Sequence, residues 1–176
     1  MSRTENIYLI GLMGVGKTTI GRQLARALKL PFHDSDKAIE EKTGVDTPTI
    51  FEYEGEEGFR QREQKIIEQL TGLRGIVLAT GGGAVLSEHN RKLLQENGFV
   101  VYLHCSIDRI LLRTRRDNKR PLLQTDNPRE RLETLLRQRE PLYQACADFT
   151  VDTGKTPGKT VVRKILQAFA ASSAAN

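Results

Sequence analysis

The stretch Gly11-Leu12-Met13-Gly14-Val15-Gly16-Lys17-Thr18 lies between two segments whose apolar residues follow different periodicities. A continuous apolar run at residues 7–10 comes directly before it and predicts a buried strand. After it, apolar residues recur at helical spacing, at Ile20, Leu24, Ala27 and Leu28. The stretch is therefore expected to connect a strand to the N-terminus of a helix.

The spacing within this stretch, G-x-x-x-x-G-K-[ST], is that of a phosphate-binding P-loop. Glycine permits positive φ and leaves space for phosphate oxygens, and the N–H groups at the start of the helix attract anions. Lys17 is expected to reach the β- and γ-phosphates of a nucleotide, and Thr18 to offer its hydroxyl to Mg²⁺. The alternative is a glycine-rich turn that precedes a helix by chance, which the flanking strand and helix disfavour.

Composition fits one globular domain that covers residues 1–176. The net charge of +5 suits either a nucleic-acid partner or an enzyme whose ligands are anions. No run of eighteen apolar residues occurs, so we expect no membrane span. Because the P-loop begins at residue 11, a signal peptide does not fit, and we expect a cytoplasmic protein.

Cysteine and histidine spacing gives no sign of a metal site or a disulfide. Cys105 and Cys146 are far apart and are expected to be buried free thiols. The three histidines lack the spacing of zinc ligands.

Strands and helices alternate along the chain. Continuous apolar runs predict strands at residues 6–10, 30–33, 75–79, 99–103 and 149–151. Helices are expected at residues 17–28, 36–43, 47–70 with a break near 54–55, 88–95, 107–113, 129–145 and 160–171. Thr47 is expected to cap its helix, Pro48 to lie in the first turn, and residues 172–176 to fray. Because such runs indicate strands buried on both faces, we expect a parallel sheet with helices on each side.

Ligands bind at the carboxyl ends of the strands in such sheets. Three polar or glycine-rich segments lie at these ends: the P-loop, residues 34–36 and residues 81–83. We therefore expect one cleft that contains all three segments.

Two aspartates at the end of the second strand are candidates for the chemistry of this cleft. Asp34 could support Mg²⁺, since carboxylate oxygens are preferred ligands of that ion. Asp36 lies two residues later in the same segment. Aspartate also favours helix N-caps, so capping is the alternative for both residues, and the two roles can coexist.

Arg60 and Arg139 could grip an anionic acceptor, because arginine binds a carboxylate bidentately. Their spacing alone equally fits solvated charges on a helix surface. The backbone N–H groups of residues 81–83 could approach the same acceptor, or the three glycines could form a flexible turn.

A dense basic run covers residues 113–120. It could be a lid whose arginine meets the transferred phosphoryl group, a solvated surface, or a nucleic-acid patch. No aromatic residue interrupts the run, which disfavours single-strand binding.

From residue 6 to residue 166 the chain resembles the bacterial shikimate kinases. The resemblance rests on several separated motifs: Gly11 to Thr19, Phe32-His33-Asp34-Ser35-Asp36, Ile50-Phe51 with Gly55-Glu56 and Phe59-Arg60, Gly81-Gly82-Gly83, Arg120-Pro121-Leu122-Leu123 and Arg139-Glu140-Pro141-Leu142-Tyr143. It implies ATP-dependent phosphorylation of shikimate at the 3-hydroxyl, on the route to chorismate and the aromatic amino acids. It also implies a three-layer P-loop kinase fold, with a five-stranded parallel sheet in the order 2-3-1-4-5 flanked by helices.

The same resemblance implies roles on the acceptor side. Residues 33–62 would form the region that binds the acceptor. Asp36 would hydrogen-bond the shikimate hydroxyls and take the proton, Arg60 and Arg139 would clamp the carboxylate, and Gly82 would contact the acceptor through its backbone.

On the nucleotide side, the resemblance implies that residues 113–127 form a lid. Within it, Arg113 would stack on adenine and Arg120 would act on the phosphates as a catalytic residue beside Lys17. Thr18 would bind Mg²⁺ directly, with Asp34 in support. The P-loop residues that would bind ATP are Gly14, Val15, Gly16, Lys17, Thr18 and Thr19. The expected partners are ATP and shikimate, without nucleic acid or membrane, and the chain is expected to act as a monomer.

Other activities remain alternatives. A gluconate kinase or a nucleoside-monophosphate kinase would have the same fold, and gluconate is also a polyhydroxy carboxylate. A GTPase switch requires Asn-Lys-x-Asp, but Asn118-Lys119 is followed by Arg120 and Pro121. A nucleic-acid binder would show strongly salt-dependent affinity, which we do not expect.

Overall fold

A computed structural model describes residues 5–115 and 123–175 of the chain. Its centre is a parallel sheet of five strands in the order β2-β3-β1-β4-β5, which confirms the predicted order. The strands are β1 (Ile7–Ile10), β2 (Phe32–Asp34), β3 (Val77–Ala79), β4 (Phe99–His104) and β5 (Phe149–Asp152). All four residues of β1 are fully buried, because helices cover both faces of the sheet.

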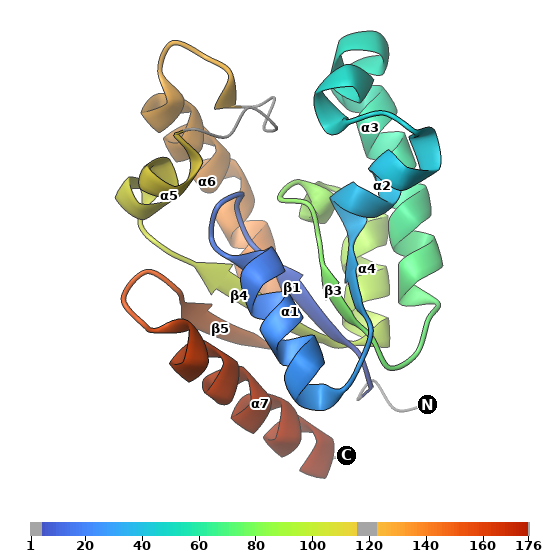
Figure 1. The fold of residues 1–176 in the computed structure, drawn as a ribbon, viewed down its shortest axis with the longest axis vertical. Coiled ribbons are helices and arrows are strands. Elements are labelled where there is room, and N and C mark those ends of the chain that lie inside the picture. The colour runs from blue at the N-terminus through green and yellow to red at the C-terminus, as the bar shows by residue number, and fades with distance from the viewer. Residues whose placement is uncertain (1–4, 116–122, 176) are drawn as a thin grey trace.

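Helices form the two outer layers. They are α1 (Lys17–Leu28), α2 (Ser35–Thr43), α3 (Thr47–Thr71), α4 (Glu88–Asn97), α5 (Ile107–Thr114), α6 (Pro128–Cys146) and α7 (Gly158–Ala174), with a short 3₁₀ helix, η2 (Ala84–Leu86). Figure 1 shows α1 and α7 on one face of the sheet, and α4 and α6 on the other. At the carboxyl edge of the sheet, α2 and the first part of α3 lie on one side and α5 on the other (Figure 1).

Most of the expected helix boundaries agree within two residues, and the exceptions have local causes. Asp46, not Thr47, caps α3: its carboxylate accepts a hydrogen bond from the Thr49 N–H at 3.0 Å, and Thr47 is the first helical residue. The predicted break in this helix is confirmed at Gly55, where φ is 71° and ψ is 179°. Residues 172–174, expected to fray, form the last turn of α7.

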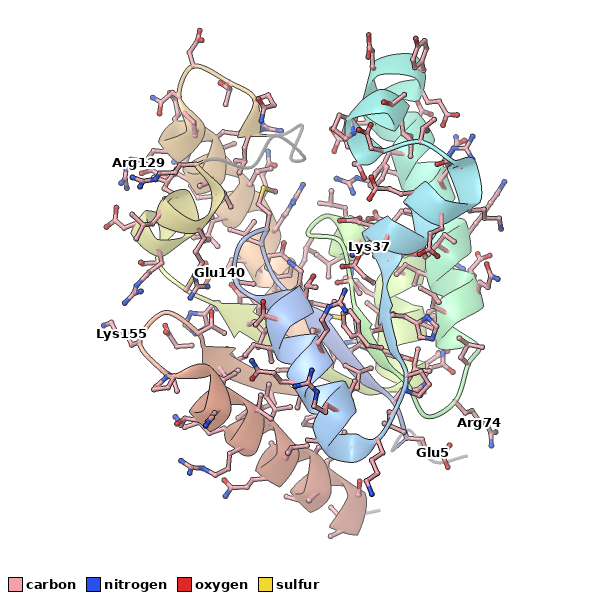
Figure 2. All side chains as sticks on the ribbon, in the orientation of Figure 1. Glu5, Lys37, Arg74, Arg129, Glu140 and Lys155 are labelled. Atoms are coloured by element: carbon pink, nitrogen blue, oxygen red, sulfur yellow. The ribbon has the colours of Figure 1, made fainter. Side chains whose placement is uncertain are left out.

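The cysteines lie in the core, and several charged side chains lie on the surface. Cys105 and Cys146 are buried free thiols, as predicted. Charged side chains such as those of Glu5, Arg74 and Lys155 point outward from the molecule (Figure 2). Within the described residues, no helix combines the length and the apolar character that crossing a membrane requires.

Candidate active site

The P-loop turns sharply between β1 and α1, and two of its glycines explain how. Gly14 has φ of 80° and Gly16 has φ of 104°, both in the region that side chains disfavour. A Cβ at Gly14 would also lie 2.7 Å from Cγ2 of Thr114. Gly16 is the N-cap of α1, and no acidic side chain occupies the first turn of this helix. The N–H groups at the start of a helix and the helix dipole therefore favour a phosphate at this position.

Lys17, the first residue of α1, folds back over the loop. Its ammonium donates hydrogen bonds to the carbonyl oxygens of Gly11 at 2.6 Å and Leu12 at 2.8 Å. These bonds hold a positive charge at the mouth of the loop, where the terminal phosphates of a nucleotide would lie.

Thr18 of α1 and Asp34 at the end of β2 are in contact and line the cleft. The Thr18 hydroxyl lies 3.0 Å from Oδ2 of Asp34. The other oxygen, Oδ1, caps α2 by accepting from the N–H groups of Asp36 at 3.0 Å and Lys37 at 3.2 Å. One oxygen of Asp34 therefore caps the helix, as the capping alternative expected, and the other is directed to the P-loop. A hydroxyl and a carboxylate side by side are donors that fit Mg²⁺.

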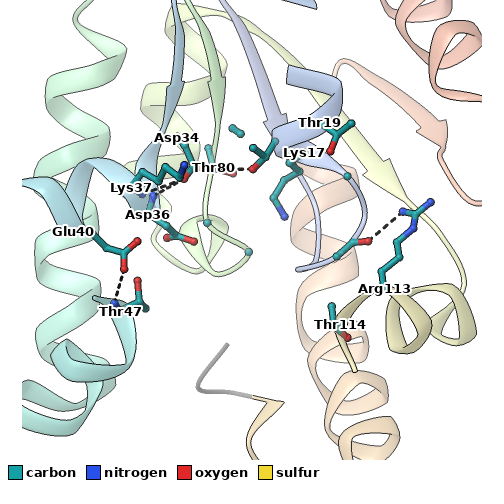
Figure 3. A pocket seen from close by; sticks show the side chains of 16 residues that line it. Lys17, Thr19, Asp34, Asp36, Lys37, Glu40, Thr47, Thr80, Arg113 and Thr114 are labelled. Atoms are coloured by element: carbon teal, nitrogen blue, oxygen red, sulfur yellow. Dashed lines mark hydrogen bonds between the residues drawn. The ribbon is translucent and has the colours of Figure 1, made fainter. Parts of the chain in front are cut away.

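The expected segments line one cleft of about 380 Å³. Figure 3 shows Lys17 at the start of α1, Asp34 and Asp36 at the start of α2, and Arg113 on α5, arranged around the same opening. The residues predicted to bind ligands that line it are Gly14, Gly16, Lys17, Thr18, Thr19, Asp34, Asp36, Gly82 and Arg113. Val15 is buried beneath them.

The triple-glycine loop that follows β3 brings the acceptor-side charges together. A Cβ at Gly81 would lie 2.5 Å from Oδ1 of Asp36, and a Cβ at Gly83 would collide with the guanidinium of Arg60. A Cβ at Gly82 would lie 3.4 Å from Nη1 of Arg139. The absence of side chains at Gly81 and Gly83 therefore lets Asp36 and Arg60 approach the loop backbone closely.

Arg139 is not the solvated helix charge that its spacing allowed. Its side chain is only 1% exposed, and burial lowers the pKa of the guanidinium. Nε and Nη1 are buried without a hydrogen-bond partner among the described residues. A buried cation with unused donors is costly unless an anion binds there.

Arg60 lies beside it, partly exposed, on α3. Its Nη1 pairs with Glu63 at 2.9 Å and its Nη2 with Glu56 at 3.3 Å. Its Nε has no hydrogen-bond partner among the described residues.

Glu63 pairs with Arg60, and our sequence analysis did not identify it as a candidate site residue. The carboxylate is 1% exposed, and burial raises its pKa to about 7, with Asp36 raising it further and Arg60 opposing the shift. A signal was present, since Glu63 follows Phe59 by four residues and precedes Ile66 by three, on the apolar face of α3.

Arg113 connects the P-loop to the loop after β5. Its Nη1 donates to the Gly14 carbonyl at 3.1 Å and its Nη2 to the Thr153 carbonyl at 3.2 Å. The Thr153 hydroxyl donates to the Val15 carbonyl at 2.6 Å. Arg120 lies outside the described residues.

Comparisons with known proteins agree with this geometry. A sequence model of the family described as "Shikimate kinase" matches residues 13–170. The shikimate kinase of Methylococcus capsulatus is 57% identical over 169 residues, covering 96% of this chain and 94% of that protein. The shikimate kinase of Thioalkalivibrio sulfidiphilus is 61% identical over 165 residues, covering 94% and 87%.

Solved structures give the same result. A structure of the Acinetobacter baumannii shikimate kinase in complex with shikimate has a TM-score of 0.92 and 48% identity, covering 95% of this chain and 93% of that one. A gluconokinase from Sinorhizobium meliloti has a TM-score of 0.61 at 19% identity, covering 98% and 95%, a likeness of fold alone.

Proposed function

The chain belongs to the shikimate kinase family, and we infer from this membership that it transfers the γ-phosphoryl group of ATP to the 3-hydroxyl of shikimate. The products are ADP and shikimate 3-phosphate, in the biosynthesis of aromatic amino acids. Family membership disfavours the gluconate, nucleoside-monophosphate and GTPase alternatives.

One observation carries the assignment of the acceptor site: the buried guanidinium of Arg139, with unused donors, lies beside Gly82 in the triple-glycine loop. The carboxylate of shikimate would accept hydrogen bonds from these unused donors. We propose that Arg139 and Arg60 bind this carboxylate from two sides, with the N–H of Gly82 as a further donor. Residues 33–62 and 81–83 then hold the acceptor.

On the nucleotide side, the phosphates of ATP would lie against the N–H groups of residues 14–19, with Lys17 neutralising charge on the transferred group. Thr18 and Asp34 would hold Mg²⁺, which supplies further charge neutralisation when bound. Asp34 also caps α2, so the same residue contacts Thr18 on the nucleotide side and the N–H of Asp36 on the acceptor side.

The transfer itself forms a bond between the acceptor oxygen and the γ-phosphorus, and it breaks the bond from that phosphorus to the β,γ-bridging oxygen. ADP leaves with the bridging electron pair. Asp36 orients the hydroxyl and takes its proton at a carboxylate oxygen. Because the transition state is loose, correct placement contributes more than the strength of this base.

The remaining assignments follow from the motifs. Arg113 would contact the adenine, and Arg120 would approach the phosphates from a lid formed by residues 113–127. We further propose a cytoplasmic monomer, because both substrates are small soluble metabolites and one chain contains the whole cleft.

A coupled assay of ADP release on the purified protein tests the function. ADP release should require shikimate and Mg²⁺ together, and gluconate should not replace shikimate. Release that is independent of shikimate, or faster with gluconate, would contradict the proposal.

A further inference from the structure

Tyr143 lies on α6 one helical turn after Arg139, and the proposed reaction assigns it no role. Its side chain is fully buried, and its ring stacks on Tyr102 of β4 with centroids 5.0 Å apart and planes at 23°. Its hydroxyl donates a hydrogen bond to the Gly82 carbonyl at 2.5 Å. A buried tyrosine hydroxyl usually has a partner, but this partner belongs to the acceptor loop.

The triple-glycine loop has no side chains of its own to fix it, and hydrogen bonds hold its peptide groups. The Gly81 N–H donates to Ser35 Oγ at 2.8 Å, and the Gly81 carbonyl accepts from the Ala84 N–H at 3.1 Å. Because a trans peptide is planar, this second bond directs the Gly82 N–H to the opposite side. The next peptide group along the loop contains the Gly82 carbonyl, which accepts the hydrogen bond from Tyr143 on α6.

Arg139 and Tyr143 are four residues apart, so they lie on the same face of α6. Both side chains are buried against the loop, and a Cβ at Gly82 would lie 3.4 Å from Nη1 of Arg139. The bond from Tyr143 therefore fixes the distance between the loop and the helix that carry two of the groups assigned to the acceptor carboxylate.

We propose that Tyr143 is a positioning residue for the acceptor: its hydroxyl holds the loop against α6, so that one carboxylate can reach both the Gly82 N–H and the Arg139 guanidinium. This inference rests on the proposed function. Burial raises the pKa of Tyr143 to about 12, so the hydroxyl stays protonated and donates at every pH at which the enzyme would work.

Tyr143→Phe tests the proposal, because it removes the hydroxyl and keeps the stacked ring. We expect the KM for shikimate to rise about tenfold, as for one lost hydrogen bond to a buried carbonyl. The KM for ATP should stay within about twofold, since the P-loop is untouched. Equal changes in both KM values, or no change in either, would overturn the proposal.

Tyr8→Phe is the matched control. Tyr8 is also fully buried, and its hydroxyl accepts from Asn6 at 2.9 Å and donates to the Asn97 carbonyl at 3.3 Å, outside the cleft. This variant should lower the Tm without a change in the KM for shikimate. A rise in KM here as large as in Tyr143→Phe would assign the effect to general loss of stability and overturn the positioning role.

Two further variants separate position from stability. In a cycle with Arg139→Lys, the double variant should lose less shikimate affinity than the product of the single losses, because the side chains of Tyr143 and Arg139 also interact directly; a simple product would contradict coupling between Tyr143 and Arg139. If Tyr143→Phe does not fold, Tyr102→Leu removes the ring that stacks on Tyr143. This variant should raise the KM for shikimate alone, by less than Tyr143→Phe would; an unchanged KM would count against the proposal.

If the wild-type protein does not phosphorylate shikimate, the proposed function fails. If the wild-type protein does so and Tyr143→Phe has the same KM values, only the positioning role fails.

Discussion

Replacing Arg139 by methionine should make the empty protein more stable while it destroys the acceptor site. The guanidinium is 1% exposed, and its Nε and Nη1 have no hydrogen-bond partner among the described residues. Burying a cation costs several kcal/mol in desolvation, and Glu63 keeps its ion pair with Arg60 when Arg139 is replaced, so we expect the free energy of unfolding to rise by about 1–3 kcal/mol. At about 2–4 °C per kcal/mol for a chain of this length, the Tm of Arg139→Met should rise by roughly 2–12 °C.

The loss of affinity follows from the same two nitrogens. A hydrogen bond between charged groups contributes about 1.5 kcal/mol or more, so two of them give about 3 kcal/mol. The Kd for shikimate should therefore rise more than about 100-fold. The Kd for ATP should change little, because Arg139 is assigned to the acceptor carboxylate and not to the phosphates.

Calorimetric titration with each ligand and thermal melts of the ligand-free protein measure these quantities. Arg137→Met is the matched control, because Arg137 is exposed on the same helix and should affect neither Tm nor affinity. A lower Tm for Arg139→Met together with unchanged shikimate affinity would refute the reasoning, since it would make Arg139 a structural residue with satisfied donors.

Three other changes test the remaining parts of the site. Lys17→Ala removes the charge at the transferred group and should lower kcat at least about 100-fold in steady-state assays; near-normal turnover would exclude the role. Asp34→Asn keeps a capping oxygen but loses charge beside Thr18, so the Mg²⁺ concentration for half-maximal activity should rise several-fold in a metal titration, whereas an unchanged midpoint would contradict a metal-supporting role. Because the pKa of Glu63 is raised from 4.5 to about 7, the native state binds its proton more tightly than the unfolded chain, and the free energy of unfolding should fall as pH rises across this interval. Glu63→Gln should flatten this slope in melts between pH 4.5 and 7, and an identical slope in the variant would show that Glu63 titrates normally.

The fold could be predicted from the sequence because its signals are local. Strands buried on both faces read as continuous apolar runs, and the P-loop fixes where the first strand ends and the first helix begins. Helix ends were less certain, since Asp46 and Thr47 are both good caps and only the hydrogen bond to Thr49 distinguishes them.

The positions of the candidate site residues could be predicted where a motif names a residue, but not where packing decides. The positions of Lys17, Thr18 and Asp34 follow from chain order along parallel strands. The burial of Arg139 does not, because it depends on the fit between α6 and a loop more than fifty residues earlier. For the same reason, Glu63 and Thr153 gained their roles from partners distant in the sequence.

The central claim is that one carboxylated acceptor lies between Arg60 and Arg139 in the cleft that holds the phosphates of the nucleotide. A crystal structure of the protein with ADP and shikimate measures this directly. We expect the shikimate carboxylate within hydrogen-bond distance of both guanidinium groups and a ring hydroxyl on Asp36. Shikimate bound elsewhere, or either arginine turned away from the carboxylate, would contradict the account.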